Sequence, residues 1–333
     1  MSIRVIRPGL LTTIQDLGRY GFQQFGVIVS GAMDPLALRI SNLLVGNEHH
    51  EAVLEITLSG PSLLFEQETL IAITGADLSA VIDGQAVPLW RPIWVRQGSL
   101  LEFGSPLCGC RAYLSVAGGF DVPIVMHSCS TYLRAGLGGI DGRALQSGDV
   151  LNLRGASPCA SQQMKRMSER GSEHPFVATD WFAGLDLADY ADDPTIRVMS
   201  GGQYDWFNDE SRESFVSQSF SITRQSDRMG YRLAGPTLRF IRPRELISEA
   251  VTMGTIQIPP EGQPIILMAD RPTTGGYAKI AQVATVDIPV LAQLKPGAKI
   301  RFLMISVEEA QGLYRSREAM VRRLGCGISQ MNL

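Results

Sequence analysis

The sequence has no stretch that could cross a membrane and no excess of positive charge. Its 30 lysines and arginines face 33 aspartates and glutamates, for a formal net charge of −3, so it offers no basic surface for a phosphate backbone. No run approaches the roughly 18–20 apolar residues of a transmembrane helix. The opening residues, MSIRVIRPGLLTT, predict a strand and lack the apolar core of a secretion signal. We expect a cytoplasmic protein with neither nucleic acid nor membrane as partner.

Residues that hold metals or form disulfides are scarce. The five cysteines are scattered and odd in number, which does not indicate a disulfide framework. Cys108-Gly-Cys110 is at most half of a metal site, because no second cysteine pair and no spaced histidine pair accompanies it. No metal ligand set is therefore identified.

Three common catalytic motifs are also missing. The chain has no G-x-x-x-x-G-K-[ST] loop for nucleotide phosphates and no G-x-S-x-G nucleophile turn. The segment GLGGIDG at 136–142 has the wrong glycine spacing for a dinucleotide site. Evidence for the function has to come from elsewhere in the chain.

Short apolar runs that recur about every ten residues dominate the sequence. They fill residues 52–154 and return from Thr195, separated by Gly, Pro, Asp or Ser, which predicts β-sandwiches or barrels. A helix is expected after Asp34, a candidate N-cap followed by Pro35. A second is expected at the C-terminus, where Ser306 and Glu309 match a capping box. The prediction is a mainly β chain with a few helices.

The change in composition suggests the domain boundaries. Residues 1–155 are expected to hold an N-terminal helix-containing segment and a first β-half. The small and polar residues 156–194 predict a linker with some helix. A second β-half is predicted over 195–310, followed by a C-terminal helix and tail over 311–333.

Polar residues gather at three loops, where binding residues tend to lie. In residues 15–34, either the loop holds a substrate or Asp16 and Arg19 pair with each other. In residues 224–235, Asp227 and Arg228 offer a carboxylate and a guanidinium fork, or form a solvated turn. The stretch ADRPTTGGYAKIAQV, residues 269–283, is a further candidate site or a glycine hairpin. Glu249 is a further carboxylate in a mostly apolar stretch, and if buried it could serve as an acid or base.

Several of these segments together resemble one known family over roughly residues 4–310. They include RPGLLTTIQDLGRYGFQQFGVIVSGAMD, YLSVAGGFDVP, QSDRMGYRLAG and SEAVTMGTIQIPPEGQPIILMADRPTTGGYAKIAQV. The chain is similar to the allophanate-hydrolase-subunit-2 family, which includes KipA-type proteins, C subunits of ATP-dependent 5-oxoprolinases and part of urea carboxylase. The resemblance implies two cyclophilin-like β-barrel subdomains.

The activity that the resemblance favours is ATP-driven opening of the 5-oxoproline lactam to L-glutamate. The implied partners are a KipI-like (PxpB-like) B subunit and a LamB/YcsF-like A subunit, with ATP bound by or shared with a partner. Alone, this chain is expected to be inactive. Two alternatives stay open: a KipA-type regulator that binds a KipI-like histidine-kinase inhibitor, and a biotin-dependent carboxyltransferase component, the one case that needs biotin.

The same resemblance matches eight site positions, and Gly275 and Gly276, which lie between two of them, complete a set of ten candidates. The catalytic candidates, which would move a proton, are Asp227, Glu249 and Asp270. Arg228 or Arg271 would hold the substrate carboxylate, and the backbone of Gly275 and Gly276 would stabilise developing charge. The substrate-binding candidates in full are Asp34, Arg228, Arg271, Thr274, Gly275, Gly276 and Tyr277.

Overall fold

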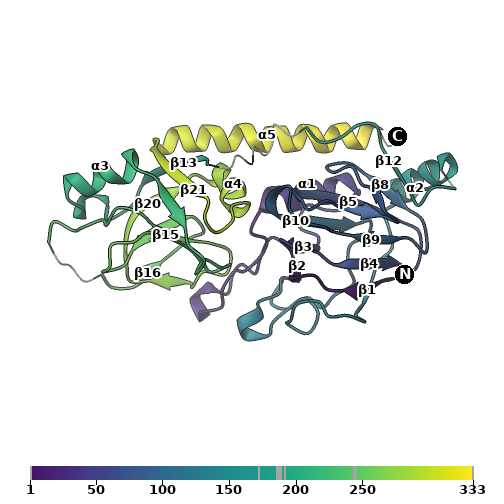
Figure 1. The fold of residues 1–333 in the computed structure, drawn as a ribbon, viewed down its shortest axis with the longest axis horizontal. Helices are drawn as coiled ribbons and strands as arrows, with labels where there is room; N and C mark the ends of the chain where they lie inside the picture. The colour runs from purple at the N-terminus through teal and green to yellow at the C-terminus, as the bar shows by residue number, and fades with distance from the viewer. Residues whose placement is uncertain (1, 172, 185–189, 191–192, 243–245, 332–333) are drawn as a thin grey trace. The chain divides into compact units, whose positions relative to one another are not determined.

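The chain folds into two compact units, and neither is continuous in sequence. The computed structural model describes residues 2–171, 173–184, 190, 193–242 and 246–331. Unit 1 comprises residues 1–19, 34–188 and 319–333, and unit 2 comprises residues 20–33 and 189–318. Strands dominate both units (Figure 1), which confirms the prediction of a mainly β chain with a few helices.

Unit 1 contains two six-stranded sheets. The first has the order β11-β1-β4-β9-β6-β7 and the second β12-β8-β5-β10-β3-β2. The strands of the first sheet are β11 (Val150–Asn152), β1 (Ser2–Arg7), β4 (Ser62–Phe65), β9 (Leu100–Glu102), β6 (Val81–Ile82) and β7 (Gln85–Ala86). Those of the second are β12 (Phe176–Ala178), β8 (Ile93–Val95), β5 (Thr69–Asp77), β10 (Cys108–Val116), β3 (Val53–Thr57) and β2 (Leu11–Gln15).

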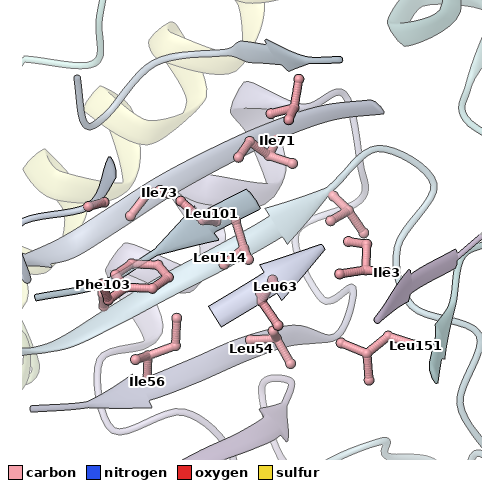
Figure 2. Close-up of a cluster of buried hydrophobic side chains, with 14 of the residues drawn as sticks. Ile3, Leu54, Ile56, Leu63, Ile71, Ile73, Leu101, Phe103, Leu114 and Leu151 are labelled. Carbon is pink, nitrogen blue, oxygen red and sulfur yellow. The ribbon is translucent and has the colours of Figure 1, made fainter. Parts of the chain in front are cut away.

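The two sheets of unit 1 share one apolar core. Ile3 and Leu63 come from the first sheet, while Leu54, Ile73 and Leu114 come from the second (Figure 2). Alternate residues of a strand point to opposite faces, so the other face of the second sheet can carry polar groups. The helix α1 (Pro35–Leu44) contacts that face, where the Thr74 hydroxyl donates to the Ala37 carbonyl at 2.7 Å.

Unit 2 is a closed barrel of seven strands. Around it run β13 (Thr195–Ser200), β20 (Ala278–Val283), β17 (Thr255–Ile258), β18 (Ile265–Leu267), β15 (Gly230–Ala234), β14 (Phe220–Ile222) and β21 (Lys299–Met304). A parallel pairing of β13 with β21 closes the ring. Beside the barrel lies a two-stranded ribbon of β16 (Glu249–Ala250) and β19 (Thr274–Gly275).

The remaining α-helices are α2 (Pro158–Arg170), α3 (Asp209–Ser217), α4 (Ile288–Ala292) and α5 (Val307–Met331). They begin after capping side chains, except for α4, which has no side-chain cap. The predicted caps are confirmed: the Asp34 carboxylate accepts from the amides of Leu36 and Ala37, and Ser306 and Glu309 bond reciprocally at the start of α5.

The compact units divide the chain differently from the predicted domain boundaries. The segment expected as a linker with some helix contains helix α2 and also strand β12, which extends the second sheet of unit 1 by pairing with β8. The first β-half forms two sheets around a shared core, and the closed barrel lies in unit 2. Helix α5 begins at Val307, four residues before the boundary expected at 311.

Candidate functional site

Three distant segments of the chain meet at Asp270 in unit 2. The Asp270 amide donates to the Arg228 carbonyl at 2.8 Å, and the Met268 amide donates to the Met229 carbonyl at 3.0 Å. These two bonds extend the antiparallel backbone hydrogen bonding between β15 and β18 beyond the ends of both strands. Residues 30–31 reach the same place from the N-terminal part of the chain.

A buried ion pair forms the centre of this meeting point. The Arg228 Nε donates to Asp270 Oδ2 at 2.9 Å and its Nη2 to Oδ1 at 3.0 Å, which is the bidentate geometry that matches a guanidinium to a carboxylate. Arg228 Nη2 also donates to the Gly31 carbonyl at 2.6 Å, and the Ser30 hydroxyl donates to Asp270 Oδ1 at 2.7 Å. We refer to Ser30, Gly31, Arg228 and Asp270 as the Asp270 clasp.

Arg271 lies next to the clasp and is bonded very differently. The residue is 9% exposed, and the hydrogen bonds of its side chain to described residues are two long ones, at 3.4 and 3.5 Å, to the carbonyls of Met268 and Ala269. Burial lowers the pKa of Arg271, while the nearby Tyr20 and Asp270 act in the opposite direction. A buried cation with weak neutral partners is suited to receive an anion.

Asp227 directly precedes Arg228 but plays a local role. Its Oδ1 accepts from the Met229 amide at 2.8 Å and from the Gly230 amide at 3.3 Å, which is the usual way an aspartate closes a turn. The residue is exposed. The turn therefore fixes the backbone that presents Arg228.

Glu249, Thr274 and Gly275 belong to the ribbon. Glu249 stands opposite Gly275 in the β16–β19 pairing, and its carboxylate accepts from Lys279 Nζ at 3.0 Å. Gln203 borders the same carboxylate and accepts from the Lys279 amide at 3.0 Å. Thus Glu249 forms an ion pair with the barrel wall.

Gly275 leaves room for a buried amide of the barrel. A Cβ at Gly275 would lie 2.3 Å from Gln257 Nε2, so a larger residue would displace that side chain. Gln257 is 4% exposed, and its Nε2 has no hydrogen-bond partner among the residues that the structure describes. The glycine that the sequence suggested as turn chemistry is required for this close approach.

Gly276 and Tyr277 line an apolar hollow of about 310 Å³ in unit 2. Tyr277 is 47% exposed. Its neighbours in the hollow are mostly aromatic or aliphatic: Trp206, Phe240, Leu246, Ile258, Pro260 and Ala278. The ten predicted residues thus fall into separate places, with Asp270, Arg228 and Arg271 forming one compact group.

The remaining predicted residue, Asp34, is in unit 1 and fully buried. Its carboxylate caps α1, and its amide donates to the Tyr113 hydroxyl oxygen at 2.8 Å. A carboxylate committed to a helix end inside the protein is not available to a dissolved substrate. We therefore assign Asp34 a structural role.

The neighbouring residues Asp16 and Arg19 also have structural contacts. The Asp16 carboxylate accepts from the Cys129 amide at 2.6 Å and from the Ser128 hydroxyl at 2.8 Å. Arg19 donates to the carbonyls of Val125 and Ser130 at 3.0 and 2.9 Å. Both side chains thus hold the segment 125–130 of unit 1.

Sequence reasoning missed Ser30, Gly31, Gln203 and Lys279. A serine and a glycine in a long loop are ordinary, and their importance arises from contacts with residues about 200 or more positions away.

Within the described part of the chain, no group of three or more His, Cys, Asp or Glu side chains could hold a metal ion. No described helix is long and apolar enough to cross a membrane.

The match to a family model decides the chain's classification. Residues 25–304 match the model described as "Carboxyltransferase domain, subdomain A and B". The chain belongs to this carboxyltransferase-domain family. The matched range contains every residue of the Asp270 clasp as well as Arg271.

Relatives within the family resemble the chain over nearly its whole length. The C subunit of 5-oxoprolinase from Escherichia coli is 40% identical over 330 residues, covering 99% of this chain and 100% of its own. The C subunit of 5-oxoprolinase from Haemophilus influenzae is 38% identical and covers 96% of both chains. The crystal structure of K. lactis urea amidolyase matches with a TM-score of 0.85 and 33% identity, over 97% of this chain and 20% of the other.

Proposed function

We propose that this chain is the C subunit of an ATP-dependent 5-oxoprolinase, which opens the 5-oxoproline lactam to L-glutamate. The observation that carries the proposal is the end-to-end similarity to two 5-oxoprolinase C subunits, at 38% and 40% identity. The matches cover 96% or more of this chain and of both relatives. The chain works with A- and B-type subunits and is inactive alone.

Arg271 is the residue that we assign to the carboxylate of 5-oxoproline. Between the two candidate arginines, Arg228 already has a carboxylate partner in Asp270, whereas the bonds of Arg271 are long and go to neutral carbonyls. An incoming carboxylate would give Arg271 a charge-assisted partner in a site that excludes most water. Burial lowers the pKa of Arg271, and the nearby Tyr20 and Asp270 oppose that shift and so favour its charged form.

The bond changes follow from the chemistry of an amide. Phosphorylation by ATP activates the lactam carbonyl oxygen, water adds to the carbonyl carbon, and the C–N bond breaks. A second water then releases phosphate from the resulting acyl phosphate. Asp227, Glu249 and Asp270 are the carboxylates proposed to move protons, and of these Asp227 and Glu249 are exposed. Thr274, Gly275, Gly276 and Tyr277 are proposed to contact the substrate.

The partners and location are part of the proposal. The names of the two bacterial relatives describe them as subunits, which implies further subunits in those enzymes. For this chain we propose a KipI-like B subunit and a LamB/YcsF-like A subunit in the cytoplasm. ATP is proposed to be held by a partner or shared with it. In this proposal, the chain contributes Arg271, which binds the carboxylate of 5-oxoproline.

Reconstitution of the three subunits tests the function. ADP release that depends on 5-oxoproline is measured with the A- and B-type subunits, with and without this chain. We expect turnover only when the chain is present. Equal turnover without it would contradict the proposal.

Substitution of Arg271 tests the carboxylate assignment. Arg271→Ala should raise KM for 5-oxoproline by about 10-fold or more, which corresponds to about 1.4 kcal/mol. Arg301→Ala is the control, because Arg301 is an exposed arginine of β21 in the same unit. An unchanged KM in Arg271→Ala would remove Arg271 from the site.

A biotin-dependent carboxyltransferase is the second candidate, favoured by the similarity to urea amidolyase. Under that function, the chain would require a biotinylated carrier protein and would act without 5-oxoproline. Carboxyl transfer from such a carrier, in the absence of 5-oxoproline turnover, would select this alternative. Binding of a KipI-like protein without either activity would instead select the regulator.

A further inference from the structure

Segment 20–33 is a long loop whose last part is bound to the barrel of unit 2. Ser30 and Gly31 are the points of attachment, and Ser30 is 4% exposed. The Ser30 hydroxyl bonds to Asp270 Oδ1, and the Gly31 carbonyl accepts from Arg228 Nη2. Two consecutive residues therefore bond to the two members of one ion pair.

The backbone at this attachment has an unusual conformation. Ser30 has a φ of +55° and Gly31 a φ of +89°. Positive φ is free for glycine but unfavourable for serine. A strained residue persists where its surroundings compensate for the strain, and such residues cluster at functional sites. At Ser30, the compensation includes a hydrogen bond to a buried carboxylate.

We propose that Ser30 is a positioning residue. It joins segment 20–33 to the Asp270–Arg228 pair and so fixes the backbone next to Arg271. This assignment rests on the proposed function for its kinetic consequence, but the structural part stands without it. The hydroxyl orients Asp270, and the backbone turn aims the Gly31 carbonyl at Arg228. Asp270 is adjacent to Arg271 in the chain, so a fixed Asp270 limits the movement of the Arg271 backbone.

Two substitutions separate the hydroxyl from the backbone strain. Ser30→Ala removes the hydroxyl and keeps a side chain at positive φ. Ser30→Gly removes the hydroxyl and relieves the strain. Ser221→Ala is the matched control, since the Ser221 hydroxyl is in the same unit and donates to a backbone carbonyl, that of Ala234, at 3.3 Å.

Hydrogen exchange on the isolated chain is the first measurement. Both Ser30 variants should speed exchange in peptides from residues 20–33 by about 10-fold or more, the size expected for loss of a hydrogen bond to a charged group. Ser221→Ala should leave those peptides unchanged. This measurement requires neither substrate nor partner.

Kinetics of the reconstituted complex are the second measurement. Both Ser30 variants should raise KM for 5-oxoproline by about 5-fold or more while kcat changes by less than about 2-fold. A variant that simply lost folded protein would lower apparent kcat and leave KM unchanged, because the folded fraction would bind normally.

Three results would overturn the positioning role. The first is wild-type exchange in both Ser30 variants. The second is wild-type exchange and kinetics in Ser30→Gly together with altered values in Ser30→Ala. The defect would then come from backbone strain and not from loss of the hydroxyl. The third is a fall in kcat with unchanged KM. A wild-type complex without 5-oxoproline turnover would instead contradict the proposed function, and the exchange result would remain interpretable.

Discussion

At the scale of single residues, the two arginines of the candidate site have opposite surroundings. Arg228 is 8% exposed and its fork is filled by Asp270, while Arg271 is 9% exposed and bonds to carbonyls at long distance. The two arginines are thus buried to a similar extent, but Arg228 is paired with a carboxylate and Arg271 bonds to neutral carbonyls. The sequence offered either arginine for the substrate carboxylate, and only the spatial partners distinguish them.

Loss of Arg228 should destabilise the protein strongly. Arg228→Met would leave the buried Asp270 carboxylate with the Ser30 hydroxyl as its remaining side-chain donor among the described residues. Breaking a buried ion pair in this way typically costs about 3–5 kcal/mol. The double substitution Arg228→Met with Asp270→Leu removes both charges and should recover a large part of that loss. Denaturant unfolding measures both, and equal stability of the single and double variants would contradict the prediction.

Cys129 should be the least reactive of the partly accessible thiols. Burial, followed by the charge of Asp16, raises the pKa of Cys129 to about 11. At pH 8 only about one thiol in a thousand would be ionised, and the thiolate is the reactive form. Iodoacetamide should label the exposed Cys326 well before Cys129, and mass spectrometry of the peptides would follow both. Equal rates at pH 8 would show that the thiol is not held in its neutral form.

At the scale of helices and strands, local capping was predictable and long-range pairing was not. Asp34, Pro35, Ser306 and Glu309 signal helix starts through atoms within three residues of one another, so the sequence alone contains the whole interaction. Strand β12 lies in a polar stretch and exists through its pairing with β8, about 80 residues earlier. The composition of residues 156–194 cannot reveal that partner.

Helix α1 should depend on Asp34 for stability and not for substrate binding. Asp34→Ala removes the acceptor for two amides and should cost about 1–2 kcal/mol. Asp34→Asn keeps an acceptor oxygen and should cost less. Thermal unfolding measures the difference, and KM for 5-oxoproline should stay at the wild-type value in both folded variants. A raised KM with unchanged stability would restore Asp34 to the substrate site.

At the scale of the whole molecule, each unit contains a segment from the far end of the chain. Residues 20–33 belong to unit 2, although the rest of that unit begins at residue 189. Residues 319–333 belong to unit 1, where Val321 and Ile328 are buried. The predicted domains were continuous because composition changes along the chain only mark continuous segments. The contact between Ser30 and Asp270 spans 240 positions, and no local pattern encodes it.

This exchange of segments predicts that the chain cannot be divided into two independent halves. A cut between residues 188 and 189 would separate Ser30 and Gly31 from Asp270 and Arg228, and would separate the buried Met33 from the barrel core. The same cut would deprive fragment 1–188 of the buried Val321 and Ile328. Each fragment alone should therefore unfold at a lower temperature and less cooperatively than the intact chain.

Adding back the missing segment tests the physical cause. Co-expression of fragments 1–188 and 189–333 should restore a cooperative transition in circular dichroism. A peptide of residues 20–33 should raise the melting temperature of fragment 189–333 in a concentration-dependent way, because a ligand that binds only the folded form stabilises it. The same peptide with Ser30→Ala should stabilise less, since it lacks the hydroxyl that bonds to Asp270. If fragment 189–333 alone melts as the intact chain does, segment 20–33 adds nothing to the stability of the barrel, which would contradict the prediction.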